Sequence, residues 1–263
     1  MEILQFDFMR NALLVGLLVS VACGMIGTYV VVKRIVFISG GISHTAYGGI
    51  GLGYYLGFNP MLGATLFTII SALGMGLVQQ RSSQRQDTVI GVMWAVGMAL
   101  GIMFVKLSPG YTADLMSYLF GSILTVPQRD ILFILLLDLL IIAAVFRYFE
   151  EFKAIAFDEE FARVSGLKVE FFNILLLILV ALTVVVMIRA VGIILVIALL
   201  TIPPAIAGEF SRGLKGMMGF SVVLGIIFTT AGLYLSYLFD LPSGATIILV
   251  AAAGYILALL MKK

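Results

Sequence analysis

The chain has 263 residues, of which 62% are hydrophobic and 11% are charged, with a net charge of +2 and a mean hydropathy of +1.18. A soluble domain carries roughly 25% charged residues, and a soluble fold could not keep so much apolar surface away from water. The low charge, without a dense run of Lys and Arg, also excludes a nucleic-acid partner, so the composition predicts an integral protein of the lipid bilayer.

The apolar stretch at residues 11–32 begins the series of predicted helices. It follows Arg10 as a secretion signal would, but it is too long and has no Ala-x-Ala exit, so we expect a retained membrane span. A helix needs roughly 17 to 25 residues to cross about 30 Å of hydrocarbon. Mostly aliphatic segments of this length occupy residues 11–32, 36–57, 60–80, 88–107, 131–147, 169–188, 191–208, 216–239 and 243–261.

These segments predict an all-α fold, a polytopic transmembrane helical bundle of about eight to nine spans in a single domain over residues 1–263. The regions 33–60 and 108–127 could each add or remove a crossing. With the N-terminus outside and the C-terminus inside, 12 of the 16 Lys and Arg residues lie in cytoplasmic loops, as the positive-inside rule requires. The four residues left outside are Arg10, Lys106, Arg129 and Arg189.

Glycines recur at every fourth position on two of the predicted spans. They form the sets Gly49, Gly53 and Gly57, and Gly97 and Gly101. Such faces let helix backbones approach closely in lipid. Bundle packing is the simpler interpretation, and the alternative is a helix that slides along this smooth face during gating.

Residues 108–127 form a less regular piece on the external side. Ser108-Pro109-Gly110 interrupts the chain, and the following residues favour a short helix that re-enters the membrane or lies at its surface. Asp114 stands at its beginning, where it would either cap this helix or lie near an entering ion.

The only long polar stretch, at about residues 148–168, separates the fifth and sixth spans and is predicted to be cytoplasmic. Asp158 is placed to cap a short helix, Glu159 and Glu160 suit its N-terminal dipole, and Gly166 can end it.

This short helix is predicted to be amphipathic. Phe157, Phe161 and Val164 follow one another at i, i+4 and i+7, and so share a face. The face either rests on the chain's own spans or docks into a groove of another protein.

Five sequence patterns in chain order carry a resemblance to one family. They are GMIGTYVVVKRIVF at 24–37, Ile42-Ser43-His44-Thr45-Ala46, DLMSYLFG at 114–121, DEEFARVSGL at 158–167 and LLTIPPAIA at 199–207. Together they resemble permeases of ATP-binding cassette importers, most closely the zinc/manganese/iron-type metal permeases.

The resemblance implies a transport subunit and not an enzyme. It implies a homodimeric pore in the cell membrane, two cytoplasmic ATPase subunits, and an extracytoplasmic binding protein that delivers a divalent metal ion as cargo, with no covalently bound cofactor. A separate ATPase agrees with the lack of a G-x-x-x-x-G-K-[ST] motif in this chain. The residues that it assigns to ATPase coupling are Phe157, Asp158, Glu159, Glu160, Phe161, Ala162 and Gly166.

The single histidine, His44, is the first candidate for a metal ligand. The resemblance implies a metal-handling histidine here, and a neutral imidazole suits zinc, manganese and iron; the alternative is a histidine hydrogen-bonded within the bundle. Many members of the family carry an aspartate four residues earlier, where this chain has Gly40. Asp114 is the best substitute carboxylate, and Asp138, alone in the middle of a span, is the other.

Pro203 and Pro204 interrupt the seventh predicted span. Proline has no amide hydrogen to donate, so we expect a kink there, with a gating hinge as a further possibility.

Two other functional classes compete with the importer. A secondary transporter or channel that works without an ATPase would need paired intramembrane charges or inverted repeats, and neither is clear in the sequence. An intramembrane metalloprotease would need a motif such as H-E-x-x-H, which one histidine excludes. The choice among zinc, manganese and iron(II) stays open.

Overall fold

The computed structural model describes residues 6–81, 86–109, 121 and 123–261. The described residues form helices and no strand, which confirms the all-α class. The helices are α1 (Asp7–Val32), α2 (Val36–Leu56), α3 (Pro60–Arg81), α4 (Gln86–Leu107), η3 (Ile123–Thr125), α6 (Gln128–Arg147), α7 (Phe149–Phe157), α8 (Glu159–Val164), α9 (Val169–Phe210), α10 (Leu214–Phe239) and α11 (Ser243–Met261).

Among the described residues, seven helical segments are long and apolar enough to cross a membrane, with α9 counted as two segments, or up to eight if the bent pair α6 and α7 counts as one span. α2 has 21 residues, enough to cross, but its glycine and polar residues make it less apolar. Fifteen of these 21 residues are buried against other helices. A helix surrounded by protein does not need an apolar surface for lipid, which explains the weaker hydropathy of α2.

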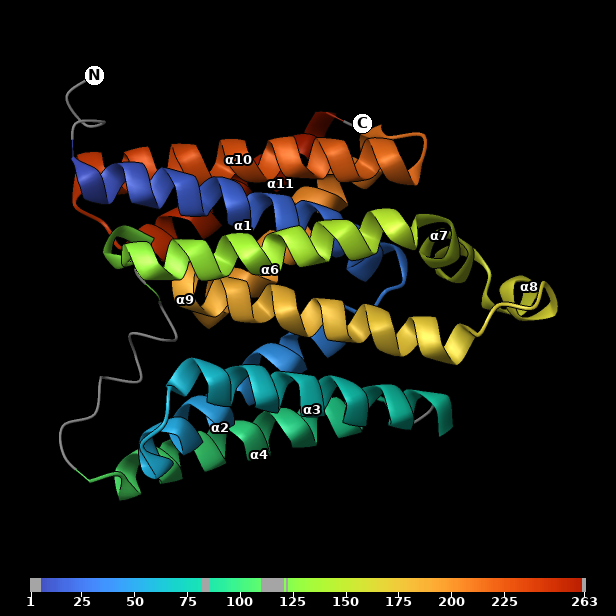
Figure 1. Ribbon diagram of the computed structural model, residues 1–263. Helices are drawn as coiled ribbons and strands as arrows, with labels where there is room; N and C mark the ends of the chain where they lie inside the picture. Colours follow the sequence, from blue (N-terminus) through green and yellow to red (C-terminus); the bar gives the residue numbers. More distant parts are fainter. Residues whose placement is uncertain (1–5, 82–85, 110–120, 122, 262–263) are drawn as a thin grey trace.

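The bundle has two groups of helices with α9 between them (Figure 1). α2, α3 and α4 lie on one side, and α1, α6, α10 and α11 lie on the other. α9 contacts α2 and α3 of the first group and all four helices of the second. α7 and α8 project beyond the bundle at one end, where α6 ends and α9 begins (Figure 1).

The repeated glycines bring α2 into backbone contact with its two neighbours. A Cβ atom at Gly49 would collide with the backbone of Gly63 on α3, and one at Gly101 of α4 would lie 2.5 Å from the carbonyl oxygen of Tyr47. These contacts agree with the packing interpretation. Gly57 differs from the set, because it ends α2 with a φ of 73° and a Cβ there would meet nothing within 4 Å.

The sixth and seventh predicted spans correspond to the two parts of α9, which are separated by a kink. Its non-helical backbone lies at Gly192, with φ 78° and ψ 166°. Pro203 and Pro204 lie inside the second part of α9, which continues to Phe210 with helical backbone angles, so a kink at the prolines stays a prediction.

A glycine of α1 accommodates the proline region of α9. Pro204 has no amide hydrogen for the carbonyl oxygen of Leu200, four residues earlier. A Cβ atom at Gly27 would lie 2.5 Å from this oxygen and 2.8 Å from Cγ of Pro204. The absence of a side chain at Gly27 therefore lets α1 lie directly against the altered turn of α9.

Candidate functional site

His44 lies within α2 and stacks on Trp94 of α4. The two ring centroids are 3.9 Å apart and the ring planes are inclined by 12°. His44 is 9% exposed, and its Nδ1 atom is buried without a hydrogen-bond partner among the described residues. The alternative of a histidine held by a hydrogen bond at Nδ1 therefore finds no support there.

The hydroxyl groups beside His44 are engaged by their own helix. Ser43 Oγ donates to the carbonyl oxygen of Ser39 at 2.7 Å, and Thr45 Oγ1 donates to that of Ile42 at 2.8 Å. Ser43 thus bonds to the backbone of α2, an arrangement that does not resemble a nucleophile paired with a histidine base.

Gly40, one turn before His44, faces the same tryptophan. A Cβ atom built there would lie 3.5 Å from Cδ1 of Ile197 on α9 and 3.7 Å from Cζ3 of Trp94. No group of three or more His, Cys, Asp and Glu residues that could hold a metal occurs in the described part of the chain. Asp114 lies outside the described residues, so its pairing with His44 stays a prediction.

Asp138, the other carboxylate considered, lies on α6. It is 1% exposed, and neither carboxylate oxygen has a hydrogen-bond partner within the described ranges. Its α6 helix packs on α1 and α9, whereas the His44 side chain faces α4. The same three helices enclose a contact between α1 and α9, where Cys23 Sγ lies 2.8 Å from Met187 Sδ. Asp138 is therefore a buried group of the α1–α6–α9 core.

The predicted cytoplasmic stretch contains two helices and not one, because Asp158 separates α7 from α8. The backbone nitrogen of Phe161 donates to Asp158 Oδ1 at 2.9 Å, which confirms the predicted cap. Gly166 follows α8 with a φ of 85°, and this left-handed conformation favours glycine.

The side chains of the predicted apolar face are open to the surroundings, but they come from two helices, because Phe157 ends α7 whereas Phe161 and Val164 lie on α8. Phe157, Phe161 and Val164 are 67%, 68% and 89% exposed. With so little burial, this face does not rest on the described spans, which was one of the two alternatives. Ala162 points the other way and is fully buried.

Lys33, which the sequence singled out for orientation and within the pattern at 24–37, ties α8 to the bundle. From the C-terminal end of α1, its Nζ lies 2.6 Å from Glu159 Oε1 and 3.0 Å from the carbonyl oxygen of Ile155 in α7. Asn173 Nδ2 of α9 also donates to Glu159 Oε1, at 3.3 Å. The sequence showed a basic residue directly after the first span. Its partner, Glu159, lies 126 residues away, so the ion pair itself could not be expected from the sequence.

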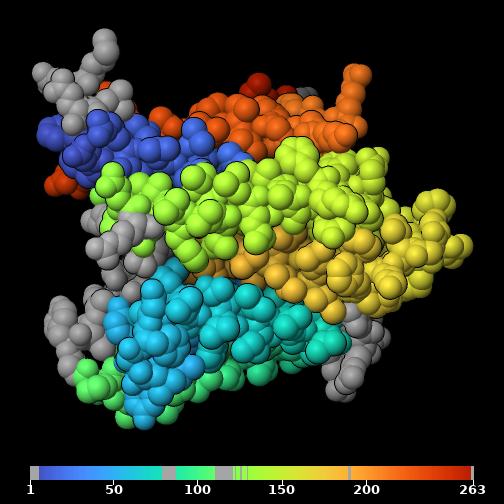
Figure 2. Space-filling model, in the orientation of Figure 1, coloured from blue at the N-terminus to red at the C-terminus, as the bar shows by residue number. Residues whose placement is uncertain are grey.

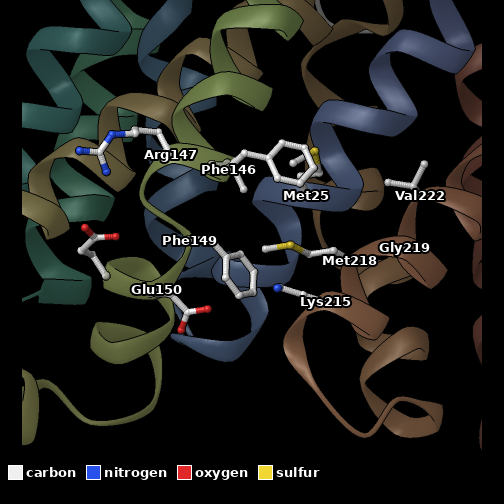
Figure 3. A pocket seen from close by; sticks show the side chains of 11 residues that line it. Met25, Phe146, Arg147, Phe149, Glu150, Lys215, Met218, Gly219 and Val222 are labelled. Atoms are coloured by element: carbon white, nitrogen blue, oxygen red, sulfur yellow. The ribbon is translucent and has the colours of Figure 1, made fainter.

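A cavity of about 770 Å³ opens where α1, α6, α7 and α10 meet (Figure 3). Met25, Met218 and Val222 form apolar walls, and Lys215 extends across the ring of Phe149 with its Nζ 4.8 Å from the ring centroid. This cavity could not be expected from the sequence, because its lining comes from four separate helices.

Comparison with known proteins places the chain beside membrane transport proteins. The model of the ABC 3 transport family matches residues 5–262. An uncharacterized membrane protein of Synechocystis sp. is 52% identical over 262 residues, which cover 100% of this chain and 93% of that protein. The manganese transport system membrane protein MntC of Listeria monocytogenes is 34% identical over 258 residues, covering 98% of this chain and 92% of MntC.

A solved structure shares the fold. PsaBC from Streptococcus pneumoniae in complex with Fab matches with a TM-score of 0.88 and 29% sequence identity, and the match covers 97% of this chain and 92% of that one.

Proposed function

The chain belongs to the ABC 3 transport family, and from this premise we propose that it is the permease subunit of an ATP-binding cassette importer that moves a divalent transition metal into the cytoplasm. The Listeria relative is named for manganese transport, which makes Mn²⁺ the first cargo to test, before Zn²⁺ and Fe²⁺. The apolar helices and the membrane-protein relatives establish a multi-pass membrane protein, as the sequence predicted.

The observation that carries the proposal is the exposed apolar face formed by the end of α7 and by α8. The exposed side chains of Phe157, Phe161 and Val164 belong to α7 and α8, the two helices that project at one end of the bundle (Figure 1). A cluster of exposed apolar side chains on a short capped helix is typical of a surface that another protein covers. The partner that we propose is a cytoplasmic ATPase subunit, whose movement α8 would transmit to the spans.

The other proposed partners are an extracytoplasmic metal-binding protein and a second copy of the chain, which together would deliver and enclose the ion. The family match favours this ATPase-driven arrangement over a secondary transporter or channel. α4 and α11 carry many exposed apolar residues, among them Ile102, Met103, Leu257 and Leu260. This surface is available to lipid and to a second copy.

Within the permease, we propose His44 as a ligand that the ion meets during transport. Its unpartnered Nδ1 supports this role, because a neutral imidazole nitrogen binds divalent transition metals. Asp114 stays a second candidate ligand, and Pro203 and Pro204 stay candidates for a gating hinge.

Co-purification tests the assignment. The chain is expressed together with a candidate ABC ATPase and metal-binding protein, and we expect a stable complex whose ATP hydrolysis rises when the binding protein is loaded with metal. A permease that folds but retains no ATPase would contradict the proposed function.

A further inference from the structure

The chain has one tryptophan and one histidine, and they stack on each other. We propose that Trp94 is a positioning residue for the transported ion: its indole holds the His44 imidazole in the orientation in which Nδ1 receives a divalent transition metal. This inference rests on the proposed transport function and names the residue that sets the geometry of its ion site.

The contact with Trp94 holds the imidazole ring of His44 in place. A metal-binding histidine usually has its ring fixed by a hydrogen bond to its other nitrogen. The hydroxyl groups of the adjacent Ser43 and Thr45 are bonded to their own helix. The contact that the structure shows for the ring is the parallel indole, at a centroid distance of 3.9 Å. Stacking on the indole therefore restricts the orientation of the His44 ring.

Trp94 contacts the imidazole from a direction that leaves the ring nitrogens open to an ion. A metal ion binds an imidazole nitrogen in the plane of the ring, along the nitrogen lone pair. Trp94 lies against the face of the ring, with an inclination of only 12°. The indole can thus restrict rotation of the imidazole without competing for the nitrogen that would bind the ion.

Trp94 lies against two successive turns of α2, at His44 and at Gly40. The same indole that stacks on His44 lies 3.7 Å from the position of a Cβ atom at Gly40. A methyl group fits there in ordinary contact, but a longer side chain would extend toward the indole or toward Ile197. The glycine at position 40 and the tryptophan at position 94 are therefore sterically matched.

Helices α2 and α4 are in close backbone contact next to His44. A Cβ atom at Gly97, one turn after Trp94, would lie 2.7 Å from Cα of Thr45. The two backbones meet at the turn that carries His44, so Trp94 has a fixed place relative to the imidazole. A displacement of α4 would move the indole and change the orientation of His44.

A fluorescence titration tests the contact directly, because Trp94 is the only tryptophan in the chain. The full-length chain in liposomes is titrated with MnCl₂ and, separately, with ZnCl₂. We expect a saturable change in Trp94 emission, and we expect His44→Gln to abolish this change while the starting emission persists. Metal binding to the wild-type chain, measured by equilibrium dialysis, without any change in emission would overturn the inference.

Uptake by variants tests whether the contact matters. Trp94→Phe keeps an aromatic face, so its half-saturating Mn²⁺ concentration is expected to stay within about twofold of the wild-type value. Trp94→Leu removes the stack, and the half-saturating concentration is expected to rise about tenfold or more, as when an orienting partner of a metal ligand is removed.

The matched control is Phe104→Leu. Phe104 also lies on α4 and stacks on an aromatic residue of α2, Tyr55, with ring centroids 5.7 Å apart, but it is remote from His44. It should leave the half-saturating concentration unchanged. Wild-type uptake with equal values for Trp94→Leu would overturn the role of Trp94 alone, whereas absence of ATP-dependent uptake by the wild-type complex would contradict the transport function. If Trp94→Leu does not fold, the wild-type titration and the Trp94→Phe variant still decide the question.

Discussion

Lys33 is the most enclosed cation among the ion pairs of the described residues. Its side chain is 7% exposed, whereas the other paired cations there are 49% to 62% exposed. It donates to Glu159 and to the carbonyl oxygen of Ile155, so it joins the end of α1 to both α8 and α7. A movement of α8 would therefore pull directly on α1.

Replacing Lys33 with methionine tests this connection. Loss of the cation leaves the Ile155 carbonyl oxygen without its donor and Glu159 without its nearest charge, at a cost of about 1–3 kcal/mol. We expect Lys33→Met to lower the Tm of the purified chain and to reduce metal-dependent ATP hydrolysis by the complex.

The control is Lys153→Met. Lys153 pairs with Glu150 at 3.2 Å, and both side chains are exposed, so the change should cost less than about 0.5 kcal/mol. Equal Tm values and equal hydrolysis rates for Lys33→Met and the wild type would show that the buried pair does not couple the helices.

At the scale of elements, α8 is a short helix that depends on its cap and on its anchor. Asp158 begins it, Gly166 follows its end, and Glu159 fixes it to α1 and α9. This leaves the apolar face turned away from the bundle, where a change of side chain does not disturb the core.

Phe161→Asp tests the coupling role of α8. A carboxylate in place of this exposed ring should abolish metal-dependent ATP hydrolysis by preventing contact with an apolar groove, while the Tm stays within a few degrees of the wild-type value. Phe6→Asp is the control, since Phe6 is also exposed, at 48%, and lies at the N-terminal end that is predicted to be outside. Full hydrolysis by Phe161→Asp would contradict the coupling role.

The contact between α1 and the proline region of α9 makes a second prediction for the elements. Gly27→Ala would place a Cβ atom 2.5 Å from the Leu200 carbonyl oxygen, so the helices must separate, at a cost of about 1–3 kcal/mol. We expect a lower Tm and slower uptake.

Gly74→Ala serves as the comparison for Gly27→Ala. A Cβ atom at Gly74 would lie 3.6 Å from the nearest atom in its surroundings, Cε of Met93, which is an ordinary contact. Its Tm should not fall. A Gly27→Ala variant as stable as Gly74→Ala would mean that α1 and α9 separate without cost.

At the scale of the whole molecule, local patterns predicted the helices well. The length and apolar character of each segment located the bounds of α1, α3 and α10 to within a few residues, because crossing a bilayer requires them. The cap at Asp158 was predictable for the same reason, since it depends on residues adjacent in sequence.

Contacts between distant segments were not predictable. The pairing of Lys33 with Glu159 and the stacking of His44 on Trp94 each join two helices, and periodicity within one segment does not determine which helices become neighbours. The effect of Pro204 is accommodated at Gly27 of another helix, and the proline motif alone does not indicate this contact.

At this scale, we propose that α9 and α1 connect the exposed helix α8 at one end of the bundle with an ion site at His44 on α2. The most direct measurement is accumulation of Mn²⁺ inside proteoliposomes that hold the permease, its ATPase and its metal-binding protein, with and without ATP. We expect Mn²⁺ accumulation that requires ATP and that falls sharply with His44→Ala at unchanged protein abundance. Accumulation without ATP, or none of Mn²⁺, Zn²⁺ and Fe²⁺ with an active ATPase bound, would contradict it.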